Sequence, residues 1–293
     1  MPHTLQNEHL SIQLDLPEEG YQSARFDWTG KIKQVTFRGM PITGRELTDP
    51  GQPDQGWGLF NEFGMEQPIG FDEMEEGEWF HKIGVGLLQK EETVYDFKKA
   101  YSIRPAQFEI HPEKEKITLI CRSELHGGYA YLLKKMIRLR SNGFILSYEL
   151  TNTGDKSIRT HEYVHNFMAI AEDAINERYR LTLPFSIRPE LFGETVNPEY
   201  LVDIGEHQIN FHGQPCEPFF FSNLSGGESV SAQWTLENVQ RQISISETGS
   251  FPCSAINLWG HGQVISPELF HEINLAHGKT TRWSRAYGIR FID

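Results

Sequence analysis

Short runs of apolar residues that alternate with polar ones recur along most of the chain. The pattern occurs at Leu10, Ile12 and Leu14, at Ile117, Leu119 and Cys121, at Phe144, Leu146, Tyr148 and Leu150, and at Trp283, Arg285, Tyr287, Ile289 and Phe291. Successive side chains of a strand point to opposite faces, so a period of two indicates strands that are half-buried against a core. Turn signals at Ser141-Asn142-Gly143 and Asn152-Thr153-Gly154-Asp155 separate such runs. The chain is therefore expected to be all-β, a meander of antiparallel strands.

Helical periodicity never extends beyond about three turns, and only short helices are expected. They are predicted to begin at Pro189-Glu190-Leu191 and near Ser266-Pro267-Glu268, because proline is well tolerated in a first helical turn. The longest irregular stretch runs from Gly44 to Glu78 and ends in an acidic run, which predicts a long loop. No repeat or shift of composition divides the sequence, so residues 1–293 are expected to form a single domain.

Composition and charge exclude several classes of protein. With 27 Lys and Arg against 40 Asp and Glu, the net charge is −13, which argues against a nucleic-acid or anionic-membrane binder. The 38% hydrophobic content can form a large core, and no apolar stretch approaches the roughly 18 residues of a membrane span. Cys121, Cys216 and Cys253 are odd in number and widely spaced, so reduced thiols in a cytoplasmic protein are expected. The sequence does not indicate an oligomeric state.

The segment His161-Glu162-Tyr163-Val164-His165 matches the HExxH pattern of zinc peptidases. That chemistry needs a helix, because only positions i and i+4 of a helix bring both imidazoles to one metal. The residues around the motif alternate instead, which favours a strand with the two histidines on one face and Glu162 on the other. A zinc hydrolase, with Glu190 as a distant third ligand, remains an alternative to a site without metal.

Two segments carry side chains suited to acid–base chemistry. As a strand, the first presents His161, Tyr163 and His165 on one surface, and a histidine can exchange a proton near neutral pH. In the second, Glu268 follows Pro267 and precedes two apolar residues, where burial is expected to raise its pKa and make it a usable base. Trp259 precedes this segment and can pack in the core or form a platform for a ligand.

The order of several motifs resembles the aldose 1-epimerase (galactose mutarotase-like) family. The resemblance is carried by Tyr148-Glu149-Leu150-Thr151-Asn152-Thr153-Gly154, Val164-His165-Asn166-Phe167, Ser266-Pro267-Glu268-Leu269-Phe270, and Gly278 leading to Trp283 and Tyr287-Gly288-Ile289-Arg290-Phe291. It covers about the last half of the chain, and the N-terminal half fits more loosely. The resemblance implies a large antiparallel β-sandwich, the supersandwich, that interconverts the α and β anomers of a free sugar. It also implies that Glu268 is the catalytic base and His165 the catalytic acid.

The family's second histidine lies in a Leu-His-Gly-Gly motif. Leu125-His126-Gly127-Gly128 matches those letters but lies only 39 residues before His165, so the match is interpreted as accidental. His81 lies 84 residues before His165 and suits the family's order better. Val164 stands where the family has asparagine, which puts galactose itself in doubt as the substrate.

The resemblance implies no metal and no organic cofactor, and a small-molecule sugar as the partner. The residues expected to bind that sugar are His81, Lys82, Glu62 and Trp259. The acidic surface disfavours phosphorylated sugars, although a local basic pocket of Lys82 and Arg285 would override it. The alternative from another class is a non-catalytic carbohydrate-binding or sugar-sensing protein on the same scaffold, because a fold does not fix an activity.

Overall fold

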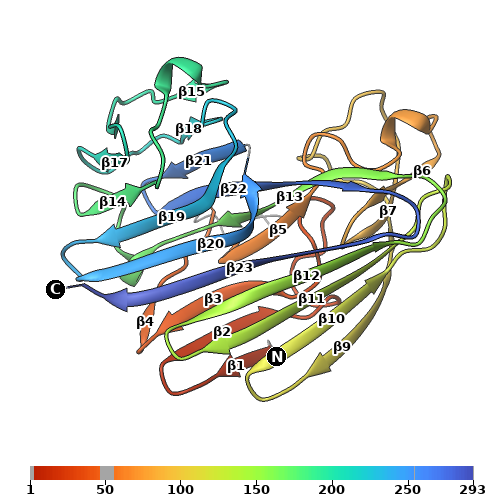
Figure 1. The fold of residues 1–293 in the computed structure, drawn as a ribbon, viewed down its shortest axis with the longest axis horizontal. Coiled ribbons are helices and arrows are strands. Elements are labelled where there is room, and N and C mark those ends of the chain that lie inside the picture. The colour runs from red at the N-terminus through yellow and green to blue at the C-terminus, as the bar shows by residue number, and fades with distance from the viewer. Residues whose placement is uncertain (1–2, 47–55, 254, 293) are drawn as a thin grey trace.

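The computed structural model of the chain describes residues 3–46, 56–253 and 255–292. The described residues form two ten-stranded sheets and one three-stranded sheet (Figure 1). The first sheet has the order β1 (His3–Gln6), β2 (Leu10–Asp15), β3 (Lys31–Phe37), β5 (Leu59–Phe63), β13 (Ile158–Asn166), β22 (Val264–Leu275), β21 (Ala255–His261), β18 (Phe219–Phe221) and β15 (Thr195–Val196), with β4 (Met40–Pro41) paired to β3.

The second sheet has the order β16 (Val202–Ile204), β17 (Gln208–Phe211), β14 (Tyr179–Thr182), β19 (Val230–Asn238), β20 (Ile243–Cys253), β23 (Thr280–Phe291), β12 (Gly143–Asn152), β11 (Tyr131–Arg140), β10 (Lys116–Arg122) and β9 (Gln107–Pro112). The small third sheet has the order β6 (Trp79–Lys82), β7 (Gly86–Gln89) and β8 (Ile103–Pro105). In the described part of the chain, three 3₁₀ turns complete the elements: η1 (Phe71–Glu73), η2 (Ile170–Glu172) and η3 (Pro189–Leu191). The expectation of an all-β, antiparallel fold is confirmed.

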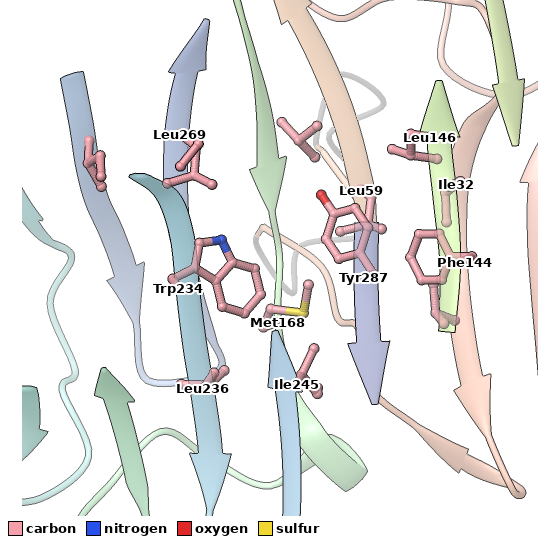
Figure 2. Packing of buried hydrophobic residues seen from close by; sticks show 14 of the residues in the cluster. Ile32, Leu59, Phe144, Leu146, Met168, Trp234, Leu236, Ile245, Leu269 and Tyr287 are labelled. Atoms are coloured by element: carbon pink, nitrogen blue, oxygen red, sulfur yellow. The ribbon is translucent and has the colours of Figure 1, made fainter. Parts of the chain in front are cut away.

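The main core lies between the inner faces of the two large sheets. Figure 2 shows Trp234, Leu236, Ile245 and Tyr287 of the second sheet in one cluster with Ile32, Leu59 and Leu269 of the first. The alternation read from the sequence follows this burial: along β23, Trp283, Arg285, Tyr287 and Ile289 are buried while their neighbours are less so. Phe291, which the same pattern includes, is 51% exposed because it lies at the end of the strand.

Two of the sequence predictions about local structure are wrong. The helix predicted near Ser266-Pro267-Glu268 does not exist, because these residues lie within β22. Proline is tolerated there because the β13–β22 ladder runs only from Ile158↔Leu275 to Glu162↔His271, so no ladder bond to β13 is lost at Pro267. The predicted loop from Gly44 to Glu78 contains β5 and η1, while its residues 47–55 lie outside the described range. The predicted helix start at Pro189 is confirmed as η3.

Strands β5, β13, β22 and β21 are consecutive in the first sheet, so residues from three distant parts of the sequence lie side by side. Their side chains alternate between the main core and the opposite face, as strand geometry requires. On that opposite face a second aromatic cluster includes Phe26, Phe60 and Phe167. Among the described residues, no helix is long and apolar enough to cross a membrane.

Candidate active site

His165 of β13 and Glu268 of β22 face each other across neighbouring strands. The register Glu162↔His271, carried three residues further, sets His165 opposite Glu268, although the ladder itself has ended there. His165 Nε2 lies 3.2 Å from Glu268 Oε1, and the two side chains are only 4% and 6% exposed. The acid and base predicted from the sequence are therefore in direct contact. They lie in a nearly closed part of the outer face, the face of the first sheet that is turned away from the main core.

Ser266 contacts both members of this pair. Its Oγ lies 2.8 Å from His165 Nδ1 and 3.2 Å from Glu268 Oε1. The backbone N–H of Asn166 donates to the same oxygen over 2.9 Å. Because Ser266 and Glu268 are two residues apart on β22, they share the face that His165 occupies.

Aromatic rings surround the histidine and exclude water from it. Phe167 stacks on His165 with ring centroids 4.1 Å apart, and Trp259 meets it edge-on at 5.2 Å. Burial in this apolar setting lowers the pKa of His165 well below its ordinary value, and the nearby Arg25 lowers it further. Burial also raises the pKa of Glu268 to about 8, against the opposing effects of Arg25 and the Ser266 hydrogen bond. Near neutral pH the unliganded pair thus holds one proton, and burial favours Glu268 as its carrier.

A buried group of charges borders the pair, centred on Glu62 of β5. Glu62 lies directly opposite Tyr163 in the β5–β13 register and accepts the Tyr163 hydroxyl over 2.7 Å. Lys82 Nζ lies 3.2 Å from Glu62 Oε1, and Arg25 Nε lies 3.1 Å from Oε2. Arg25 also pairs with Glu46 at 3.4 Å. Although burial alone would raise the pKa of Glu62, the two cations outweigh it and lower that pKa, so Glu62 is ionised.

The four residues predicted to bind sugar do not all lie in the same surroundings. Glu62 and Lys82 form the buried pair just described, and Trp259 contacts His165, so these three lie with or beside the acid–base pair. His81 points to the opposite side of β6 from Lys82, where its ring packs against Tyr129 and Tyr131. The structure therefore does not bring His81 to the pair.

The Leu-His-Gly-Gly segment forms a tight turn. His126 and Tyr129 exchange backbone hydrogen bonds across Gly127 and Gly128, whose φ angles are +59° and +85°. Both central positions of such a turn need left-handed backbone, which glycine adopts without strain. The two glycines thus have a conformational explanation that involves no sugar, and the His126 carbonyl lies 3.3 Å from His81 Nε2.

The predicted basic pocket of Lys82 and Arg285 does not form. Arg285 points into the main core, where it contacts Glu162 Oε2 at 2.7 Å and Glu247 Oε1 at 2.6 Å. The guanidinium therefore lies on the inner side of the first sheet, while Lys82 binds Glu62 on the outer side. The same contacts explain Glu162: the HExxH segment is strand β13, and its glutamate faces away from His165. Within residues 3–46, 56–253 and 255–292, no three or more His, Cys, Asp or Glu residues are arranged to hold a metal ion.

The sequence does not predict the contacts of three side chains around the site. Ser266 appears there in an expected helix start and in a motif of the resemblance, with no role of its own, although in a strand its spacing of two from Glu268 would place both on one face. Tyr163 was placed on the histidine face, but its partner Glu62 is 101 residues away. Arg25 lies in a segment without periodicity, so no local pattern indicates that it reaches Glu62.

The chain is similar to solved structures in its fold, but comparisons of its sequence find no match. No protein-family model matches the sequence, and no curated protein matches it either. Among solved structures, a galactose mutarotase-like protein from Lactobacillus casei superposes with a TM-score of 0.62 at 11% identity, covering 99% of this chain and 100% of that one. This chain has the galactose mutarotase-like fold.

Two further structures lead to the same assignment of the fold. A galactose mutarotase related enzyme from Lactobacillus acidophilus matches with a TM-score of 0.61 at 10% identity, over 100% of this chain and 99% of that one. An aldose epimerase homologue from C. elegans matches with a TM-score of 0.57 at 11% identity, over the full length of both chains. The resemblance inferred from the motifs of the C-terminal half thus extends, at the level of the galactose mutarotase-like fold, to the whole chain.

Proposed function

We propose that the chain is an isomerase of the aldose 1-epimerase type, which interconverts the α and β anomers of a free sugar. Ring opening requires one group to take the proton of the anomeric hydroxyl and another to protonate the ring oxygen. Both oxygens are bonded to the same carbon, so two protein groups that lie side by side can reach both of them. The observation that carries the proposal is the 3.2 Å contact between His165 and Glu268, on the outer face and beside a polar cluster.

In this mechanism the pair works with a single mobile proton. Glu268 removes the anomeric proton while His165 protonates the ring oxygen, and the two exchange roles when the ring recloses after rotation of the carbonyl group. Because burial favours the proton on Glu268 before sugar binds, it must first move to His165 Nε2 across the 3.2 Å contact. No other reactant is needed, since one proton enters and one leaves the sugar in each step.

The buried charges indicate what kind of sugar the site accepts. Arg25 and Lys82 are already paired with Glu62 and Glu46, so neither of these two cations is left uncompensated for a phosphate group. Polar groups of this kind suit hydroxyls, which donate and accept together, and Trp259 offers an apolar edge to the hydrocarbon side of a pyranose. We therefore propose an uncharged free sugar as the substrate, with Glu62, Lys82 and Trp259 among the residues that bind it.

The pH dependence of anomer equilibration tests this mechanism. The active state holds one proton in the pair, so the rate should fall as that proton is lost above a pKa of about 8. It should fall on the acidic side only well below pH 6.5, because burial lowers the pKa at which His165 accepts a second proton. Polarimetry of freshly dissolved α-glucose and α-galactose from pH 4 to pH 10 measures this profile. The rate that counts is the part due to the protein, after the rate in buffer at the same pH has been subtracted. If this part rises steadily from pH 8 to pH 10, the shared-proton mechanism is contradicted.

A non-catalytic sugar-binding protein is the second candidate. It is favoured by the low exposure of His165 and Glu268, 4% and 6%, because a nearly closed site suits the retention of a ligand. Such a protein would bind sugars in a titration but would leave the rate of anomer exchange at the value of the buffer. The two functions are therefore separated by one comparison of binding and exchange on the same sample.

A further inference from the structure

We propose that Ser266 is a positioning residue that keeps the proton between His165 and Glu268 mobile. This inference rests on the proposed function, because it concerns the same acid–base pair. Neither the resemblance nor the motifs assign a role to this serine, which is fully buried on β22. The number of protons and lone pairs at its oxygen limits what this serine can do.

A serine hydroxyl has one proton to donate and two lone pairs to accept with. The backbone N–H of Asn166 occupies one lone pair of Ser266 Oγ, at 2.9 Å. The remaining lone pair and the single proton must serve His165 Nδ1 at 2.8 Å and Glu268 Oε1 at 3.2 Å. Ser266 can donate to one of these atoms but not to both, so only two arrangements are possible.

In the first arrangement Ser266 donates to Glu268 and accepts from a protonated Nδ1 of His165. The Nε2 lone pair then faces Glu268, and the carboxyl proton can move to Nε2 and back without any rotation of the serine. In the second arrangement Ser266 donates to Nδ1, so neutral His165 carries its proton on Nε2, which already points at Glu268 and can accept nothing. Only the first arrangement allows the proton transfer that the mechanism needs.

The proton on Glu268 favours the first arrangement, and the contacts of Asn166 hold Ser266 where that arrangement needs it. Burial raises the pKa of Glu268 to about 8, so the carboxyl carries a proton that needs an acceptor at Nε2. Asn166 then fixes Ser266 in place, because its side-chain Nδ2 donates to the Pro267 carbonyl at 2.7 Å and to Glu247 at 3.0 Å. The residue after His165 thereby holds the backbone between Ser266 and Glu268, which keeps the three side chains in register.

The tautomer of His165 tests the proposal without any sugar. In ¹⁵N-labelled protein near pH 7, the two ring nitrogens of His165 should report a proton on Nδ1 and none on Nε2, with His165→Asn used to assign the signals. In Ser266→Ala the Nδ1 partner is lost, and the signals should shift toward a mixture of tautomers. A proton found on Nε2 in the parent protein would overturn the proposal, whatever the variant does.

Kinetics give the second readout. Ser266→Ala should lower kcat for anomer exchange by roughly 10- to 100-fold, the range expected for loss of a hydrogen bond to a charged group, with little change in KM. The alkaline fall in rate should also move to higher pH, because the Ser266 hydroxyl lowers the pKa of Glu268 in the parent protein and its removal lets that pKa rise. The matched control is Ser244→Ala, a serine 2% exposed on β20 of the other sheet, which should change neither readout.

The outcomes separate this proposal from the proposed function. If the parent protein exchanges no sugar faster than buffer, the epimerase proposal fails, while the ¹⁵N signals still decide the role of Ser266. If exchange is catalysed but Ser266→Ala keeps the parental tautomer, kcat and alkaline limb, the positioning role is wrong and the function stands.

Discussion

Glu268→Gln is expected to lower the turnover of anomer exchange by roughly 10²- to 10⁴-fold, the range that a positioned general base contributes. Glutamine keeps the shape of the side chain, so it can still fill the space against Ser266 and His165, but it cannot take up a proton. The variant should nevertheless bind sugar, because Glu62, Lys82 and Trp259 are unchanged. Initial rates from polarimetry, measured with the substrate that the parent uses best, give the comparison.

The variant should also remain folded. The pKa of Glu268 is raised to about 8, above the 4.5 of a free glutamate, so its contribution to the free energy of unfolding becomes less favourable as the pH rises toward 8. Glutamine removes this penalty, and Glu268→Gln should unfold at the same denaturant concentration or a higher one above pH 8. A folded variant that exchanges anomers at the parental rate would show that Glu268 is not the base.

His165→Asn is the matching change for the acid. Because the two groups pass one proton between them, the double variant should be little slower than the slower single variant. If the fold losses of turnover in the two single variants multiply in the double variant, His165 and Glu268 act in separate steps. That result would contradict the mechanism proposed from their 3.2 Å contact.

Arg285→Met is expected to destabilise the protein by about 3–5 kcal/mol, the usual cost of removing one partner from a buried ion pair. Arg285 is fully buried between the sheets and contacts the carboxylates of Glu162 and Glu247 at 2.7 and 2.6 Å. Removing the guanidinium leaves two carboxylates in the core, and Glu247 already has a pKa raised by burial. Urea denaturation followed by fluorescence measures the change in the free energy of unfolding.

The same strand provides a matched control. Arg282 of β23 pairs with Glu149 at 2.6 Å, but its side chain is 70% exposed. An exposed pair contributes only about 0–1 kcal/mol, so Arg282→Met should hardly change the unfolding midpoint. Equal losses from the two substitutions would contradict the view that Arg285 compensates buried charge in the core.

The sequence predicted the strands well because their signal is local. Alternation of polar and apolar residues along β10, β12 and β23 depends only on neighbours in the chain, and it identified the faces that the core buries. Alternation also separates Glu162 from His165 correctly in the HExxH segment. The prediction is wrong at Pro267, because proline in the sequence favours a helix start, whereas in the structure the ladder to β13 ends before this residue and a strand can hold it.

The partners of the charged residues could not be predicted in the same way. The sequence predicts Lys82 and Arg285 in one basic pocket, yet the structure puts them on opposite sides of the first sheet, Lys82 with Glu62 and Arg285 with Glu162 and Glu247. Such pairings depend on which strands become neighbours, and β5, β13 and β23 are far apart in the sequence. His81 and His126 show the same limit: spacing along the chain favoured His81 over His126 as a site residue, but only the fold determines what each histidine faces.

The rate of α-to-β exchange in the presence of the parent protein tests the central claim most directly. Magnetisation-exchange NMR on a panel of free aldoses, with EDTA in the buffer, measures this rate at equilibrium and needs no coupled enzyme. The account predicts exchange that is faster than in buffer for at least one sugar, proportional to protein concentration and lost in Glu268→Gln. Exchange at the buffer rate for every sugar that the protein binds would contradict the claim and leave a sugar-binding protein in its place.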